Sequence, residues 1–246
     1  MLRKVIAALG GVLIATAIVG VALAGGRGHQ RLAPTAATPA FDPGDFTPGA
    51  AVTNAYFPLP VGRTLVYTGI KDGQTQRDTV TITNETKTIL GVQTTVIRDV
   101  ADHDGTLLER TDDWYAQDKQ GNVWYLGEDT AAFGKNGKVD TSGSWQGGVN
   151  GAVPGIIMEA DPQIPNAYRQ EFLAGQAEDT AWVVDLGGTV TVPYGKVRNV
   201  LTSLEATVLD PGAYDQKVYG PGLGIILEQA LSGPAEVAKL VSVTGP

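Results

Sequence analysis

The 246-residue sequence contains no cysteine and only two histidines, His29 and His103. Without cysteine the chain has no disulfide framework, no thiol nucleophile and no residue to carry a cysteine-linked lipid anchor. A serine protease-like triad needs a histidine base. Because His29 lies in a segment without apolar pattern and His103 in the acidic turn of residues 102–105, we expect neither nucleophilic hydrolysis nor zinc catalysis.

Beyond residue 24 the sequence also lacks a convincing helical repeat. Apolar and polar residues alternate over short stretches, and turns rich in Gly, Pro, Asn and Asp separate these stretches. The pattern predicts a mainly β fold: a single curved antiparallel sheet or half-barrel, connected as a meander. The expected strands are residues 63–70, 77–83, 92–100, 168–172, 180–186, 189–194, 200–209, 216–219, 224–228 and 237–243, with a hairpin at 107–128.

Three parts of this pattern are less regular. Residues 84–91 are expected to turn the chain, and the glycine-rich stretch 130–167 is expected to form a long loop or lid. Residues 199–209 leave a short helix open as an alternative to a strand. GPGLG at 220–224 lacks the strand-to-helix context of a phosphate-binding loop, so no nucleotide or other cofactor is predicted.

The N-terminal end has the pattern of an export segment. Arg3 and Lys4 precede an uncharged stretch, residues 5–24, which suits a cleaved signal peptide or an uncut membrane anchor. Either alternative places the remaining chain outside the cytoplasm. Residues 25–51, rich in Pro, Ala, Gly and Thr, are expected to be a disordered spacer, and residues 52–246 an extracytoplasmic β-rich domain.

The charge balance restricts the partners. The chain has 26 acidic and 18 basic residues, and two of the basic ones lie in the first 24 residues, so the remainder carries a net charge of −10. Such a surface disfavours nucleic acid and anionic lipid. The open partner classes are an apolar or glycan ligand, or a protein partner in the cell envelope.

The hairpin at 107–128 is the richest stretch in aromatic and acidic residues. Gly121 in DKQGN suits a turn that needs a positive φ angle. The predicted pairs are Asp118–Asn122, Tyr115–Tyr125, Ala116–Trp124, Trp114–Leu126 and Asp112–Glu128. This register predicts one face with Asp112, Trp114, Trp124, Leu126 and Glu128, and an opposite face with Asp113, Tyr115, Val123 and Tyr125.

Asp112, Trp114, Trp124 and Glu128 are therefore the candidate ligand-binding residues. We favour a non-catalytic envelope binding or interaction module, whose ligand lies on the concave face of the sheet under the 130–167 segment. The alternative is a carboxylate-dependent hydrolase that acts on cell-wall or extracellular glycan through Asp112 and Glu128. Packing of the tryptophans in a core is the competing structural explanation. No metal site is predicted, because neither acidic turn has the spacing of a calcium loop.

Four stretches resemble patterns in exported bacterial domains of unknown function, many of them lipoproteins. They are N-x-Y-F-P-L-x-x-G-x-x-x-x-Y at 54–67, DDWYAQDKQGNVWYLGED at 112–129, TVTVPYGKVRNVL at 189–201 and YGPGLGII at 219–226. The resemblance implies a curved antiparallel sheet in the envelope and no established activity. The chain departs from the pattern at Leu65, where an aromatic residue is common, and it lacks the lipidated cysteine, so lipid anchoring is not carried over.

Overall fold

The structure is a computed structural model that describes residues 36–71, 73–134, 137–233 and 235–246. The predictions of an export segment at 1–24 and of a spacer up to residue 35 lie outside these ranges. The described residues form strands and one short 3-10 turn, η1 (Pro43–Asp45). In this part of the chain, no helix has the length and apolar character needed to cross a membrane.

The strands follow one another in chain order as a long meander. Their bounds are β1 (Thr64–Lys71), β2 (Gln74–Ile89), β3 (Val92–His103), β4 (Thr106–Gln117), β5 (Val123–Phe133), β6 (Val139–Asp140), β7 (Trp145–Gln146), β8 (Val153–Met158), β9 (Ala167–Arg169), β10 (Glu171–Phe172), β11 (Asp179–Val192), β12 (Gly195–Thr207), β13 (Asp215–Gly220), β14 (Gly224–Ala230) and β15 (Val237–Thr244).

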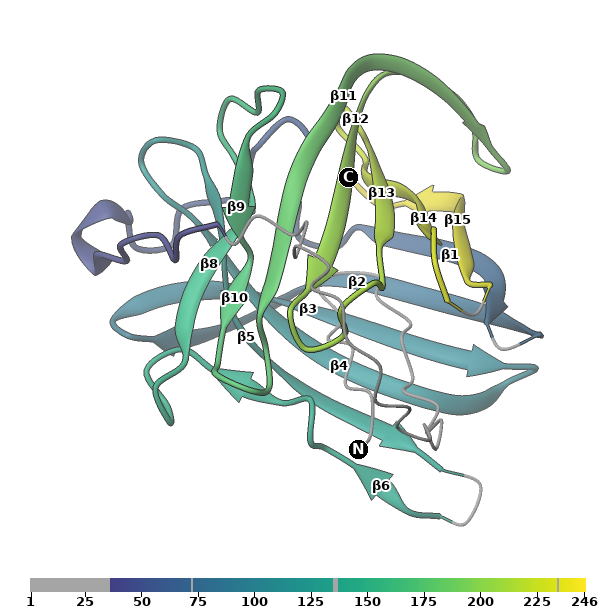
Figure 1. The fold of residues 1–246 in the computed structure, drawn as a ribbon, viewed down its shortest axis with the longest axis horizontal. Coiled ribbons are helices and arrows are strands. Elements are labelled where there is room, and N and C mark those ends of the chain that lie inside the picture. The colour runs from purple at the N-terminus through teal and green to yellow at the C-terminus, as the bar shows by residue number, and fades with distance from the viewer. Residues whose placement is uncertain (1–35, 72, 135–136, 234) are drawn as a thin grey trace, which may run out of the picture.

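All strand pairs are antiparallel and belong to one sheet, in the order β10-β8-β5-β4-β3-β2-β1-β15-β14-β13-β12-β11-β9. The two end strands of this order, β9 and β10, are separated in the chain only by Gln170. β9 pairs with β11 and β10 pairs with β8, so the stretch 167–172 brings the two ends together. The sheet therefore curls almost into a barrel with one seam (Figure 1), which confirms the predicted curved antiparallel sheet.

Two predicted breaks are wrong because the strands run through them. β2 continues to Ile89, and the chain turns only at Leu90 and Gly91, whose φ angles are 50° and 85°. Two consecutive positive φ angles suit a tight hairpin. β11 likewise continues past the predicted Gly187-Gly188 break as a bulge. Residues 199–207 lie in β12, so the helical alternative for this stretch is wrong.

The apolar residues form two clusters, one on each side of the sheet. The larger fills the barrel interior and includes Ile82, Tyr125 and Tyr219. The smaller lies outside β3, β4 and β5, and includes Trp124 and Phe46. Phe46 belongs to residues 41–51, which the sequence assigned to the spacer, yet this part packs against the sheet. The folded unit thus includes residues before 52.

The character of the interior changes along the barrel axis. Apolar inward positions occupy one end, and on neighbouring strands the inward positions become charged toward the other end. The paired registers keep these positions on one face. The series are Leu65, Tyr67 and Lys71 on β1; Ile82, Val80 and Asp78 on β2; Ile97 and Asp99 on β3; Tyr115 and Asp113 on β4; Tyr219 and Lys217 on β13; Ile226 and Glu228 on β14.

Candidate functional site

The central hairpin has the predicted register only near its turn. Tyr115 pairs with Tyr125 and Ala116 with Trp124, as expected. Beyond these pairs a β-bulge places Trp114 opposite Gly127 instead of Leu126. Gly127 has a φ angle of 139°, and a Cβ atom there would collide with the backbone of β7. The bulge therefore depends on glycine, and it adds one residue to β5.

This extra residue reverses the face on which Glu128 lies. Glu128 pairs with Asp113 and Asp112 pairs with Asp129, so the predicted Asp112–Glu128 pair is wrong. Asp112 points outward, where its carboxylate accepts hydrogen bonds of 2.7 and 3.1 Å from the Arg98 guanidinium. Glu128 points into the barrel and is 2% exposed.

Trp114 and Trp124 both lie in the outer apolar cluster. The Trp124 indole donates a 2.8 Å hydrogen bond to Asp118, and the rings of Phe41 and Phe46 pack against it at centroid distances of 5.4 and 6.0 Å. The Lys87 ammonium lies 3.2 Å from the centroid of the Trp114 ring. The four candidate residues thus do not share a surface, because Glu128 is on the opposite face from the other three. Their role in binding a ligand stays a prediction.

The inner face instead gathers carboxyl groups at one end of the barrel. They come from strands that are distant in the sheet but sense one another across the interior: the charge of Glu228 on β14 raises the pKa of Asp78 on β2. The carboxyl residues of this acidic interior are Asp78, Asp99, Glu109, Asp113, Glu128, Glu171, Asp179, Glu205, Asp215 and Glu228. Lys71 and Lys217 lie among them.

One part of the acidic interior surrounds Asp113, Glu128 and Glu171. The Tyr125 hydroxyl donates a 2.7 Å hydrogen bond to Asp113. Burial raises the pKa of Glu128 well above its usual range, the charges of Asp113 and Glu171 raise it further, and Tyr125 opposes this effect. Tyr125 and Trp145 lie close enough to Glu128 and Glu171, respectively, to lower their pKa values, but no described donor reaches full hydrogen-bonding geometry with either carboxyl. Glu128 and Glu171 are therefore poorly supplied with hydrogen-bond donors.

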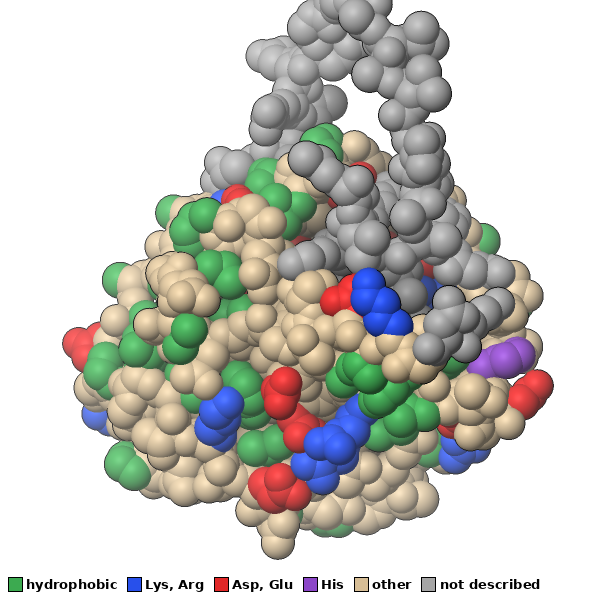
Figure 2. All heavy atoms as spheres, turned by 90° about the horizontal axis from the view of Figure 1, so that it is seen from below, with side chains coloured by type: hydrophobic (Ala, Val, Ile, Leu, Met, Phe, Trp, Pro, Cys, Tyr) green, Lys and Arg blue, Asp and Glu red, His purple; other side chains and the backbone are tan. Residues whose placement is uncertain are grey.

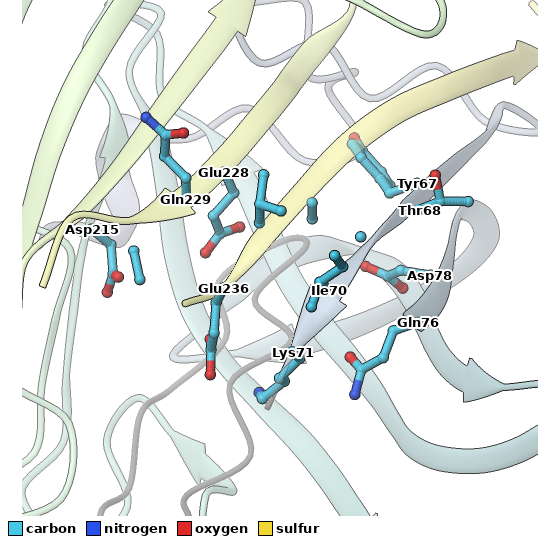
Figure 3. Close-up of a pocket in the computed structure, with 14 residues that line it drawn as sticks. Tyr67, Thr68, Ile70, Lys71, Gln76, Asp78, Asp215, Glu228, Gln229 and Glu236 are labelled. Carbon is cyan, nitrogen blue, oxygen red and sulfur yellow. The ribbon is translucent and has the colours of Figure 1, made fainter. Parts of the chain in front are cut away.

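A second part of the acidic interior borders a small pocket between β1, β14 and β15 (Figure 3). The carboxyls of Asp78 and Glu228 approach it from opposite sides, and water-sized groups can occupy about 30 Å³ of it. Burial raises the pKa of Asp78 well above its usual range, and the neighbouring carboxyl of Asp99 adds to this. Burial also raises the pKa of Glu228 to about 8, against the opposing charge of Lys217.

Glu205 shows how a carboxylate in this interior can be satisfied. The Lys217 ammonium lies 2.7 Å from its Oε2 atom, and Gln170 donates a 3.2 Å hydrogen bond to its Oε1 atom. The hydroxyls of Ser203 and Tyr219 each donate to the same Oε1 atom at 3.3 Å. This buried ion pair fixes one carboxylate, whereas Asp78, Glu128 and Glu171 have no comparable set of donors.

The distribution of charges on the surface differs from that in the interior. On the face shown in Figure 2, acidic and basic side chains lie side by side. Over residues 36–246, leaving aside the few positions that the structure does not describe, no three His, Asp or Glu side chains converge as metal ligands.

The sequence did not single out Asp78, Glu171 or Glu228 as site residues. The signal for Asp78 is its phase, because it lies two and four residues before Val80 and Ile82 and so shares their face. Glu228 is in phase with Ile226 in the same way. These phases place a carboxyl on the buried face of a strand, where an acidic residue is uncommon.

No family model matches the chain, and no curated protein matches it. Among solved structures, it is similar to a candidate lipoprotein from Parabacteroides distasonis, with 12% identity and a TM-score of 0.44, over 78% of this chain and 99% of that one. It is also similar to a candidate exported protein with a YmcC-like fold from Bacteroides fragilis, with 12% identity and a TM-score of 0.45, over 78% of this chain and all of that one. At this distance neither likeness carries an argument about function.

Proposed function

We propose that this chain is an exported, non-catalytic binding module of the cell envelope, and that its acidic interior binds an organic cation. The export pattern of residues 1–24 supports the location. The observation that carries the ligand class is the set of buried carboxyls with too few hydrogen-bond donors, above all Asp78, Glu128 and Glu171, whose oxygens have no described donor in full hydrogen-bonding geometry. A partner that brings positive charge and N–H donors stabilises ionised interior carboxylates through charge-assisted hydrogen bonds.

The physical argument starts from repulsion. Several ionised carboxylates in one poorly hydrated space raise one another's pKa, so each either keeps its proton or acquires a cationic partner. Lys217 supplies such a partner for Glu205. The remaining carboxyls outnumber the interior lysines, so an organic cation would convert protonated, under-solvated acids into charge-assisted hydrogen bonds.

The geometry supports binding over catalysis by the predicted pair. A hydrolase that uses Asp112 and Glu128 needs both carboxyls at one glycosidic bond. The bulge at Gly127 places them on opposite faces of the sheet. The stretch 130–167 does not form a lid over the site, because β7 and β8 pair with β5 and extend the sheet.

The test is calorimetric titration of the full chain with organic cations at pH 6 and pH 8, in buffers of different ionisation enthalpy. The interior carboxyls hold protons in the free protein and lose them to the buffer when the cation binds, so binding should release protons and should be tighter at pH 8. Glu128→Gln and Glu171→Gln should weaken binding, whereas Glu85→Gln, on a side chain that is 56% exposed, should not. The proposal would be contradicted if the affinity changed neither with pH nor with Glu128→Gln or Glu171→Gln.

A further inference from the structure

We infer that the pocket between β1, β14 and β15 binds the primary ammonium group at the end of an unbranched alkyl chain. The ligand class of the proposed function, on which this inference rests, is then a linear diamine or polyamine. The pocket, its unpartnered acceptors and the second acidic cluster each support this assignment independently.

The pocket admits only a small group. Its water-accessible volume of about 30 Å³ leaves room for one or two water-sized groups. A primary ammonium is close to water in size, whereas a trimethylammonium group is several times larger. The pocket should therefore accept primary amines and exclude quaternary ones.

The acceptors around the pocket suit the donors of an ammonium. A primary ammonium carries three N–H donors and no acceptor. Three side chains that line the pocket have buried oxygens that accept no hydrogen bond from another described residue: Asp78 with both oxygens, Glu228 with Oε2 and Gln76 with Oε1. Hydrogen bonding between the carboxyls of Asp78 and Asp99 contributes to the raised pKa of Asp78. Tyr67 forms part of the wall, but its hydroxyl already donates a 2.8 Å hydrogen bond to the Ile225 carbonyl. β2 thus presents two of these acceptor groups, and β14 presents the third.

The ammonium of the chain's own Lys71 also borders the pocket, and its charge acts on two of the pocket's carboxyls and on Glu109. It lowers the pKa of Glu109, Asp215 and Glu228. The pKa of Asp78 is raised by burial and by other carboxyls, Asp99 first among them. An external cation beside Asp78 would offset this repulsion.

The second acidic cluster gives the ligand its second charge. Asp78, Asp99 and Asp113 lie on the inner faces of the neighbouring strands β2, β3 and β4, and Asp113 pairs with Glu128 on β5. The pocket and the cluster are therefore neighbours within one interior, and Asp99 raises the pKa of both Asp78 and Asp113. A flexible chain with an amine at each end can place one ammonium in the pocket and the other beside the cluster.

The experiment is calorimetric titration of the full chain with 1,4-diaminobutane, 1,5-diaminopentane and spermidine. Butylamine tests the need for a second charge, and hexamethonium, a linear bis-quaternary cation, tests the size limit. A diamine should bind at least about tenfold more tightly than butylamine, and hexamethonium should show no binding. Asp78→Asn should raise the Kd of the diamines by about tenfold or more, the scale of a lost charge-assisted hydrogen bond.

Asp104→Asn is the matched control, because it removes the same charge from a side chain that is 87% exposed. Circular dichroism establishes whether the variants fold. If Asp78→Asn does not fold, Glu228→Gln tests the same pocket. If Glu171→Gln weakens diamine binding while Asp78→Asn and Glu228→Gln do not, the pocket assignment is wrong and the proposed function stands. If no organic cation binds at any pH, both are wrong.

Discussion

Replacing Glu228 with glutamine should stabilise the protein at alkaline pH. Burial raises the pKa of Glu228 to about 8 from an ordinary value of 4.5, with Glu205 and Asp215 adding to the effect and Lys217 and Lys71 opposing it. The folded state therefore holds a proton that the unfolded chain has released. Since the unfolded chain binds fewer protons between these two pKa values, the free energy of unfolding falls as the pH rises through this window.

The magnitude follows from the two pKa values. Each pH unit of difference corresponds to about 1.4 kcal/mol, so ionising Glu228 costs the folded state up to about 5 kcal/mol above pH 8. This contribution is fully present below pH 4.5 and lost above pH 8. Glutamine keeps the size of the side chain and carries no ionisable proton. The variant should match its parent near pH 4.5 and exceed it by several kcal/mol at pH 8.5.

Urea unfolding of parent and variant at pH 4.5, 6.5 and 8.5 measures this difference. Glu85→Gln serves as the control, because Glu85 is an exposed partner of Arg98 and its loss should cost less than about 1 kcal/mol at any of these pH values. The reasoning is refuted if the parent becomes more stable from pH 4.5 to 8.5, or if parent and variant show the same dependence on pH.

Three further substitutions test the packing that builds the site. Gly127→Ala should lower the free energy of unfolding by more than about 2 kcal/mol, because a Cβ atom meets the backbone of Trp145 in β7. Thermal denaturation measures the change, and an unchanged midpoint would contradict the role of Gly127 in the bulge. Trp124→Ala should cost about 3–5 kcal/mol through lost packing, and a nearly unchanged urea midpoint would instead favour a ligand platform. Phe46→Ala should cost about 3 kcal/mol and shift the tryptophan fluorescence to longer wavelength, whereas Phe133→Ala, at a more exposed position, should do neither.

The alternation of apolar residues and the positions of Gly and Pro were sufficient to predict the sheet. They also predicted the hairpin pairs next to Gly121, because a short turn fixes the register of the residues beside it. They failed at Gly127, since the backbone that approaches this glycine belongs to β7, which no local pattern connects to it. A one-residue change in register exchanges the faces of a strand, and Glu128 moved into the interior for that reason.

The acidic interior depends on an arrangement that is not local in sequence. The phase of Asp78 with Val80 marks a buried carboxyl, but the sequence does not reveal that Glu228 shares the same space. That neighbourhood exists only because β1 pairs with β15, near the opposite end of the chain. Acidic residues toward strand ends ordinarily meet water, but closure of the barrel buries the ones named here.

The closure by residues 167–172 also bears on how the protein behaves at high concentration. A β-rich chain usually risks intermolecular strand addition at the free edges of its sheet. Here both terminal strands of the described sheet, β9 and β10, are short and come from one stretch of six residues, and each is hydrogen-bonded to a neighbour. The two ends of this order therefore offer a second molecule no long unpaired strand. Strand addition would instead have to use the β11–β12 hairpin, where β11 beyond Trp182 pairs, among the described strands, only with β12.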